Sequence, residues 1–331
     1  MGVPRGTGLG ASDAPLHSAY DAGLLDLDGV LYRGADPVEH AADSVAAARR
    51  AGLRIAFVTN NASRHPGVVA AHLSELGIPA EPDEVVTSAQ AAARTVAAAV
   101  AAGAAVLVLG TDALAETVEA AGLRPVRRIA EAGPDGVAAV VQGLAATTSM
   151  ADLSEATVAL RAGALWVVGN TDSTFPSPRG LLPGNGAFVT LLQDLTGLHP
   201  VVAGKPDPAL HGESVARVQA VRPLVVGDRL ETDVLGAVRG GADSLLVLTG
   251  VTDVRALLAA PPGSRPTYVS TDLRGLGLAH PTVVVDGGRA TCRAATATLD
   301  GRAVTVDATG DDALRAEVAL TWAVADRAQM S

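Results

Sequence analysis

Aromatic side chains are scarce in this chain of 331 residues, at 2% of the sequence. Its core must therefore be built from Ala, Val and Leu, and it has few of the aromatic rings on which single-strand nucleic-acid binders stack bases. The formal net charge of -10 also argues against a nucleic-acid partner, because phosphate backbones are bound mainly by Lys and Arg. We expect no DNA or RNA partner.

Long apolar runs are also missing. No run reaches the roughly 18 residues that a membrane span requires, and residues 1–20 lack the continuous apolar stretch of a secretory signal. The one cysteine, Cys292, cannot form an internal disulfide, which fits a reducing compartment. These features predict a cytoplasmic protein without a membrane partner. The hydrophobic fraction of 48% against 18% charged residues predicts a well-filled globular core.

Lysine is almost absent, since only one of the 25 Lys and Arg residues is a lysine, Lys205. Its ammonium is a compact charge on a thin stem, which suits a narrow pocket around a carboxylate or phosphate better than the wide guanidinium of Arg. Gly204 lets a backbone approach closely, and Pro206 and Pro208 stiffen the segment that follows. A surface lysine that survives by chance is the alternative interpretation.

Short runs of Val, Leu and Ile alternate with Ala-rich helical patterns, which is typical of βαβ units and a parallel sheet covered on both faces. We predict a Rossmann-like, doubly wound α/β core over residues 20–102 and 199–279, preceded by a loose tail over residues 1–19. The expected strands are 24–28, 54–59, 224–228 and 244–249, and the expected helices are 38–51, 66–76, 208–220 and 232–239.

Residues 103–198 repeat the same alternation on a smaller scale, with strands expected at 105–109, 137–141 and 165–168 and helices at 113–121 and 153–162. Polar strand ends precede and follow this stretch, so we predict an α/β domain inserted into the core. Residues 280–331 predict a small α+β segment, with strands at 282–286 and 302–308 and a helix at 311–327. Its simplest role is extra packing or the formation of a homodimer.

Two carboxylates end the first expected strand, in Asp26-Leu27-Asp28-Gly29. Alternation along a strand would put Asp26 and Asp28 on one side, where two like charges need a cation or hydrogen bonds to offset their repulsion. A plain Asp-Gly turn is the alternative. A calcium-binding EF-hand loop fits poorly, because the apolar Val30 and Leu31 follow instead of further oxygen ligands.

Polar residues also follow two other expected strands. Thr59 and Asn60 offer a hydroxyl and amides that suit an anion or, alternatively, the cap of the next helix. Asp228 and Asp233 suit Mg²⁺, which favours one or two carboxylates with waters and a substrate phosphate. Asp233 could instead interact with a helix dipole. Together with Lys205, these clusters lie at or near the carboxyl ends of expected parallel strands, where open α/β sheets bind ligands.

Four motifs resemble, in order, those of the haloacid dehalogenase (HAD)-type phosphatases: Asp26-Leu27-Asp28-Gly29, Thr59-Asn60-Asn61, Gly204-Lys205-Pro206 and Gly227-Asp228-Arg229 with Thr232-Asp233. The resemblance covers roughly residues 20–275. Asn170-Thr171-Asp172 and the stretch 180–186 are similar to the C2-type cap of the NagD-like subgroup, which includes nucleotide, sugar-phosphate and pyridoxal phosphate phosphatases. The whole chain looks most like the actinobacterial glycerol 3-phosphate phosphatases.

The resemblance implies a mechanism. Asp26 would attack the phosphorus and form an aspartyl phosphate, and Asp28 would act as the general acid and base. The cofactor Mg²⁺ would be held by the Asp26 side chain, the Asp28 backbone carbonyl and the Asp228 side chain, with Asp233 orienting its waters. The phosphoryl oxygens would be bound by the following groups: the Lys205 ammonium, the Thr59 hydroxyl, and the backbone amides of Gly29 and Asn60.

The insertion, residues 103–198, would then be a cap that selects the leaving group through Asp172 and the turn Gly184-Asn185-Gly186. The implied substrate is a small phosphorylated metabolite, with glycerol 3-phosphate first and pyridoxal phosphate, phosphoglycolate or nucleotides as alternatives. A phosphomutase and a non-catalytic phosphometabolite sensor are the competing functions. A haloacid dehalogenase would need neither a metal nor Asp28, and the C-terminal segment lacks the Gly-rich loop of an acetyltransferase.

Overall fold

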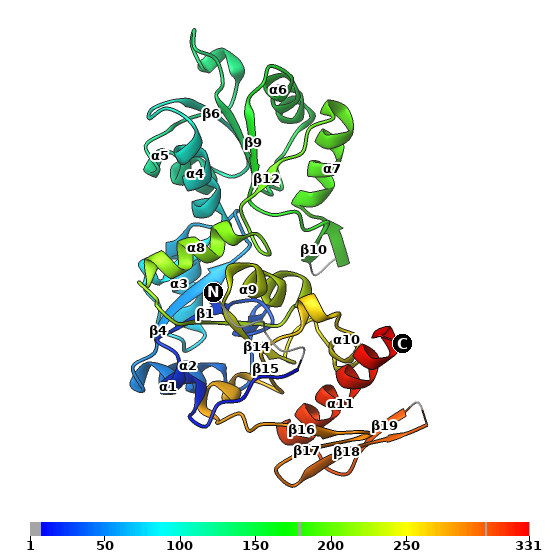
Figure 1. Ribbon diagram of the computed structural model, residues 1–331. Coiled ribbons are helices and arrows are strands. Elements are labelled where there is room, and N and C mark those ends of the chain that lie inside the picture. Colours follow the sequence, from blue (N-terminus) through cyan, green and yellow to red (C-terminus); the bar gives the residue numbers. More distant parts are fainter. Residues whose placement is uncertain (1–7, 178–179, 302, 331) are drawn as a thin grey trace. The chain divides into compact units, whose positions relative to one another are not determined.

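The computed structural model describes residues 8–177, 180–301 and 303–330 and divides into two compact units (Figure 1). Unit 1 comprises Met1–Phe57, Leu73–Pro79 and Val215–Ser331, and unit 2 comprises Val58–His72 and Ala80–Ser214. Unit 2 is therefore larger than the expected insertion, because it also takes residues from both expected segments of the core. Among the expected elements, residues 1–7 of the tail and Arg302 lie outside the described residues.

A six-stranded sheet has the order β15-β14-β13-β1-β4-β5. Its strands are Tyr268–Ser270, Asp243–Val247, Pro223–Gly227, Ala22–Asp26, Arg54–Thr59 and Val85–Thr87, in that order. The first four strands belong to unit 1 and pair in parallel, with Leu24 opposite Val225 where β1 meets β13. Strand β4 passes from unit 1 into unit 2 after Phe57. These strands are buried along most of their length, as parallel strands covered on both faces are.

Before its C-terminal segment, unit 1 also contains short helices, turns and the hairpin of β2 and β3. They are α1 (Leu16–Ala19), β2 (Tyr32–Arg33), β3 (Asp36–Pro37), α2 (Ala41–Arg50), the π-helical turn η3 (Leu230–Val234), α9 (Leu235–Gly240), α10 (Val254–Leu258), and the 3₁₀ turns η4 (Pro262–Ser264) and η5 (Leu273–Gly277). The helix expected over 232–239 is thus a π-helical turn followed by a short α-helix.

The expected loose tail is held in place from Gly10 onward. The Gly10 amide donates to the Thr267 carbonyl at 2.7 Å, Ser12 forms a β-bridge with His280, and Leu16 is fully buried. The prediction of a loose tail is therefore wrong for residues 10–19, because apolar burial and backbone pairing outweigh the Gly-rich composition of the preceding residues.

Unit 2 has its own five-stranded parallel sheet, with the order β12-β9-β8-β6-β7. Its strands are Val201–Val202, Leu165–Val168, Ala139–Gln142, Ala105–Leu109 and Arg124–Val126. The helices and turns are α3 (Pro66–Glu75), η1 (Pro82–Glu84), α4 (Ser88–Ala99), α5 (Asp112–Ala120), η2 (Ile129–Glu131), α6 (Met150–Arg161), α7 (Asn185–Thr196) and α8 (Pro208–Arg217), with the hairpin β10 (Thr174–Ser177) and β11 (Gly180–Pro183). Helices α3 and α8 each end in unit 1.

The core of unit 2 lies between this sheet and helices α6 and α7, and it includes Leu107, Val140, Leu160, Trp166 and Leu192. Helix α4, which was not among the expected helices, packs against β8, β9 and α5. A capping box between Thr87 and Gln90 fixes its first turn. The predicted α/β character of the insertion is therefore confirmed.

The C-terminal segment forms an antiparallel sheet of β16 (Val284–Asp286), β17 (Arg289–Cys292), β18 (Ala295–Asp300) and β19 (Ala303–Val306), followed by α11 (Asp311–Met330). Figure 1 shows α11 running beside this sheet and α10. Ala316 and Leu320 pack against the sheet, whereas Val318 and Trp322 pack against residues of α10 and β15. The predicted α+β segment is confirmed, and its helix shares a core with the rest of unit 1.

Among the residues that the structure describes, no helix combines the length and apolar character needed to cross a bilayer.

Candidate active site

The chain turns sharply after β1, and this turn carries the first motif. Asp26 is the last residue of β1 and is half-buried, while Asp28 is exposed. The Leu31 amide donates to the Leu27 carbonyl at 2.8 Å, and the Gly29 amide donates to the Tyr32 carbonyl at 2.8 Å. The strand thus ends two residues earlier than expected, so Asp28 is placed by the turn and not by strand alternation.

The same turn changes the expected role of Gly29. Its N–H is engaged by the Tyr32 carbonyl, which is at odds with the expected hydrogen bond from this amide to a phosphoryl oxygen. What the position requires is a residue without a side chain. The φ angle is 88°, and a Cβ atom here would lie 2.5 Å from Oδ2 of Asp228.

Asp228 lies just after β13 in a slot between two glycines. A Cβ atom on Gly250 would come within 1.9 Å of Asp228 Oδ2, so both glycines leave room for this carboxylate. The side chain is fully buried, and Oδ2 accepts a hydrogen bond of 2.6 Å from the Val251 amide. The slot and this hydrogen bond fix the direction of the carboxylate.

Asp233 reaches the same place from the π-helical turn η3. Its Oδ2 accepts from the Arg229 amide at 3.1 Å, and its side chain packs directly on Gly227, where a Cβ atom would fall 2.2 Å from Cβ of Asp233. It is only 2% exposed. The wide π-helical turn therefore directs Asp233 toward the end of β13 and away from solvent.

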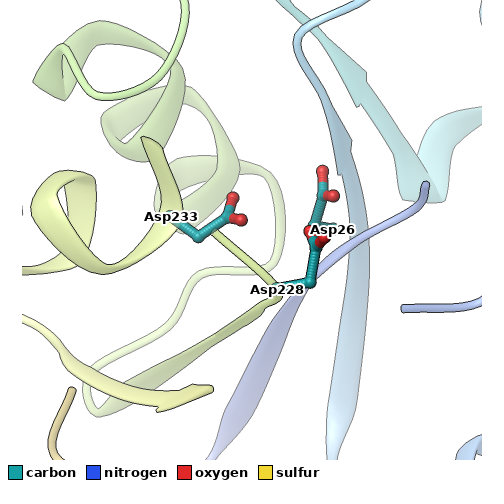
Figure 2. A group of neighbouring side chains, drawn as sticks. All are labelled: Asp26, Asp228 and Asp233. Atoms are coloured by element: carbon teal, nitrogen blue, oxygen red, sulfur yellow. The ribbon is translucent and has the colours of Figure 1, made fainter. Parts of the chain in front are cut away.

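Figure 2 shows the resulting group of three carboxylates, Asp26, Asp228 and Asp233, in unit 1. One oxygen of each lies within 4.8 Å of the other two. Three like charges this close, two of them almost excluded from water, repel one another unless a cation offsets them. The hard oxygen donors and the glycine-lined slot fit a divalent ion such as Mg²⁺.

The composition of this group differs from the expected ligand set in one respect. Asp233 contributes an oxygen to the same cluster as Asp26 and Asp228, whereas we expected it to act only through metal-bound water. The side chain of Asp28 is not part of the group, and the role of its backbone carbonyl as a ligand stays a prediction.

The remaining predicted phosphate-binding residues lie together in unit 2. Thr59 ends β4, and its Oγ1 accepts from the Asn61 amide at 3.1 Å, so its own hydrogen can be donated to an anion. The Asn60 side chain forms two hydrogen bonds with the Lys205 backbone. Its Oδ1 accepts from the Lys205 amide at 2.7 Å, and its Nδ2 donates to the Lys205 carbonyl at 3.1 Å. Lys205 Nζ lies 3.5 Å from the Val58 carbonyl.

Lys205 does follow a parallel strand, but that strand belongs to the sheet of unit 2. Strand β12 pairs with β9, and the Ala203 amide continues the ladder to the Val168 carbonyl at 2.9 Å. Gly204 is required here, because its Cβ would lie 2.2 Å from the Gly169 carbonyl oxygen and 2.6 Å from Asn60 Oδ1. The expected close approach of a backbone at Gly204 is confirmed.

The residues expected to select the leaving group divide into two kinds. Gly184, Asn185 and Gly186 are all buried at the start of α7, which is at odds with the expected contact between this turn and a substrate. Cβ atoms on the two glycines would lie 2.2 Å from the carbonyl oxygens of Asp172 and Thr171, so these glycines serve close backbone packing. Asp172 is half-buried and stays a candidate for substrate contact.

Comparisons with known proteins agree with this geometry. Residues 23–124 match the family profile described as haloacid dehalogenase-like hydrolase, and residues 202–276 match a second HAD-hydrolase-like profile. The D-glycerol 3-phosphate phosphatase of Mycobacterium tuberculosis is 54% identical over 257 residues, which cover 78% of this chain and 71% of that protein. A 5'-nucleotidase of Bacillus subtilis is 35% identical over 70% of this chain and 89% of its own length.

Solved structures give the same result. The crystal structure of the glycerol phosphate phosphatase of Mycobacterium tuberculosis in complex with magnesium matches with a TM-score of 0.82 and 47% identity, covering 93% of this chain and 92% of that one. A thermostable NPPase from Geobacillus stearothermophilus matches with a TM-score of 0.69 and 32% identity, covering 77% and 96%. Together with the grouped carboxylates, these matches show that the chain belongs to the haloacid dehalogenase-like hydrolase family.

Proposed function

We propose that the chain is a Mg²⁺-dependent phosphatase that hydrolyses small organophosphate monoesters through an aspartyl phosphate, with glycerol 3-phosphate as its substrate. The observation that carries the proposal is the group formed by Asp26, Asp228 and Asp233, in a member of a hydrolase family whose relative at 54% identity is named D-glycerol 3-phosphate phosphatase. A bound Mg²⁺ would supply positive charge between an anionic nucleophile and an anionic substrate.

The carboxylates have distinct tasks in this proposal. Asp26, half-buried at the end of β1, attacks the phosphorus, and the resulting acyl phosphate is reactive enough for water to hydrolyse. Asp228 and Asp233, fixed by backbone N–H donors, hold Mg²⁺ together with Asp26. Asp28 is exposed two residues beyond the nucleophile, so it can reach a leaving oxygen, protonate it, and later accept a proton from the attacking water.

Binding of the phosphoryl oxygens is assigned to Lys205, the Thr59 hydroxyl and the Asn60 amide. The support is the order of the four family motifs along the chain and the two hydrogen bonds that join Asn60 to Lys205 in unit 2, where Thr59 also lies. Preorganised donors of this kind stabilise the charge that develops on a transferring phosphoryl group. The proposed choice of leaving group by Asp172 rests on its partial exposure alone.

The test is phosphate release from glycerol 3-phosphate, pyridoxal phosphate, phosphoglycolate, nucleoside monophosphates and sugar phosphates, with Mg²⁺ and with a chelator. Metal-dependent release that favours glycerol 3-phosphate and disappears in Asp26→Asn supports the proposal. A preference for another ester keeps the mechanism and replaces the substrate. No release from any ester, with a sugar phosphate isomerised instead, would show a phosphomutase, and binding without turnover would show a sensor.

A metal readout independent of turnover completes the test. Mg²⁺ should raise the melting temperature of the wild-type protein and have a smaller effect on Asp228→Asn, because one carboxylate of the group is lost. A homodimer and a cytoplasmic location stay predictions, which gel filtration and fractionation of cells would address.

A further inference from the structure

A series of hydrogen bonds, made by side chains to the side chain or backbone carbonyl of the next residue, runs through unit 2 and ends at the Lys205 backbone. Its members are Trp166, Gln142, Asn185, Asn170 and Asn60, which we call the amide relay. The first four are between 0% and 7% exposed, and all five belong to unit 2. They come from four separate segments of the chain, and none of the four family motifs contains the first four of them.

The bonds of the relay follow one another in a single direction. Trp166 Nε1 donates to Gln142 Oε1 at 3.1 Å, and Gln142 Nε2 donates to Asn185 Oδ1 at 3.2 Å. Asn185 Nδ2 donates to the Asn170 carbonyl at 2.6 Å, and Asn170 Nδ2 donates to the Asn60 carbonyl at 2.8 Å. Each buried side-chain amide thus donates one hydrogen bond to the next member.

The relay ends at Lys205, whose backbone is bound by the Asn60 side chain through two hydrogen bonds. The Asn60 side chain accepts from the amide and donates to the carbonyl of Lys205, so it fixes both polar backbone groups of that residue. The Asn60 carbonyl is itself held twice, by Asn170 Nδ2 and by Ser88 Oγ at 2.7 Å. The neighbouring Gly204 leaves no spare room, because even a Cβ atom there would meet Asn60 Oδ1 at 2.6 Å.

Stability alone does not account for such a relay. Burying an amide costs free energy unless it is fully hydrogen-bonded, and apolar side chains of similar volume would fill the same space at less cost. A fully bonded polar network instead selects one arrangement of the segments that it joins. Here the joined segments are the sheet of unit 2, the start of α7 and the loop that presents the single lysine.

We propose that Asn60 is a positioning residue for Lys205, and that Asn170, Asn185 and Gln142 hold Asn60 in place from the core of unit 2. This inference rests on the proposed function, in which Lys205 binds the phosphoryl group. The relay sets the direction from which the lysine stem leaves the backbone. Because a displacement of about 1 Å at a reacting group can cost about 100-fold in rate, a loose Lys205 backbone lowers turnover even when the ammonium is present.

The test is a double-mutant cycle between Asn60→Ala and Lys205→Ala, measured as kcat and KM on an activated aryl phosphate, whose easier hydrolysis keeps weak variants measurable. Asn60→Ala keeps the backbone amide and should lower kcat/KM by about 10-fold to 100-fold. Added to Lys205→Ala, it should lower kcat/KM by less than about 3-fold further, because nothing remains to be positioned.

Two further variants separate positioning from loss of stability. Ser149→Ala removes the cap of α6 in the same unit, lowers stability, and should leave kcat/KM unchanged, because no relay bond is lost. Asn185→Leu should also lower kcat/KM. In the double variant with Asn60→Ala, the fall in kcat/KM should be smaller than the product of the two single effects. If Asn185→Leu does not fold, the half-buried Asn60 still provides the cycle.

The outcomes are distinct. Wild-type activity in Asn60→Ala would overturn the inference and leave the proposed function intact. The same holds if Asn60→Ala lowers kcat/KM by the same factor in the wild-type protein and in Lys205→Ala. A Lys205→Ala variant as active as the wild type would overturn both the inference and the assigned role of the lysine. A wild-type protein that hydrolyses no phosphate ester would refute the proposed function itself.

Discussion

Acid should weaken unit 1 through one buried histidine, His280, which is 1% exposed. Its ring nitrogens contact the Gly275 carbonyl and the Arg315 guanidinium at 2.9 and 3.0 Å. The carbonyl can only accept and the guanidinium can only donate, so the neutral ring carries its hydrogen on Nε2. Burial and, to a lesser extent, the Arg315 charge lower the pKa of His280 to about 4, against the opposing effects of the Gly275 carbonyl, Asp311 and Asp312.

The direction in which pH changes the free energy of unfolding follows from proton binding. Between pH 6.5 and 4 the unfolded chain takes up a proton at this histidine and the folded chain does not, so the free energy of unfolding falls as the pH falls. With pKa values of 6.5 unfolded and about 4 folded, the loss between pH 7 and pH 4.5 is about 2 kcal/mol. Above pH 7 the histidine is neutral in both states and has no such effect.

The measurement is urea unfolding at pH 7 and at pH 4.5, followed by tryptophan fluorescence, since Trp322 is buried in the same unit. His280→Gln replaces the ring with a neutral group that can donate and accept, and it should lose about 2 kcal/mol less than the wild type between the two pH values. Gly263→Ala, which changes no titratable group and meets no atom within 4 Å, should leave the wild-type pH dependence of stability unchanged. Equal losses in the wild type and in His280→Gln would refute the reasoning.

Three further predictions concern the site and the core. Gly250→Ala places a Cβ atom 1.9 Å from Asp228 Oδ2, so it should lower kcat/KM by about 100-fold or more and reduce the Mg²⁺-induced rise in melting temperature. The control Gly263→Ala, with no atom within 4 Å of its Cβ, should change neither quantity. A fully active Gly250→Ala would contradict the assigned slot. Lys205→Arg should lose about 100-fold in kcat/KM, nearly as much as Lys205→Ala, and near-normal activity would show that a compact charge is not required. Trp322→Ala should lower the free energy of unfolding by about 3–5 kcal/mol in urea titrations, because the ring is 1% exposed where α11 packs against α10 and β15, and its Nε1 donates to the Leu257 carbonyl at 3.1 Å. A loss below about 1 kcal/mol would show that α11 is not part of the core.

The sequence predicted the longer buried strands of the six-stranded sheet. Strands β1, β4, β13 and β14 are runs of Val, Leu, Ile, Ala or Phe that are covered on both faces, so their hydrophobic pattern needs no partner to be recognised. The short strands β5, β7, β12 and β15 have two or three residues each and were not expected, because so few residues carry no pattern apart from the sheet that they join. The π-helical turn η3 likewise depends on packing against β13 and β14.

The candidate site was predictable as a set of residues and much less as a geometry. The sequence indicated Asp26 and Asp228 because they lie at the ends of expected strands, and Lys205 because it is the single lysine. The sequence could not show that the Gly29 amide is occupied by the Tyr32 carbonyl, or that Asn185 is buried. The grip of Asn60 on Lys205 joins residues 145 positions apart, and pairing at that distance leaves no signal in a single sequence.

The division of unit 1 along the chain has a consequence for protein synthesis. Asp26 leaves the ribosome early, but β13 and η3, which carry Asp228 and Asp233, follow only after all of unit 2 has been translated. Helix α11, whose Trp322 packs on residues of α10 and β15, is the last of the described elements. A nascent chain therefore carries Asp26, the proposed nucleophile, without the other two carboxylates of the group until residue 233 has been translated, and the proposed site can form only after that point.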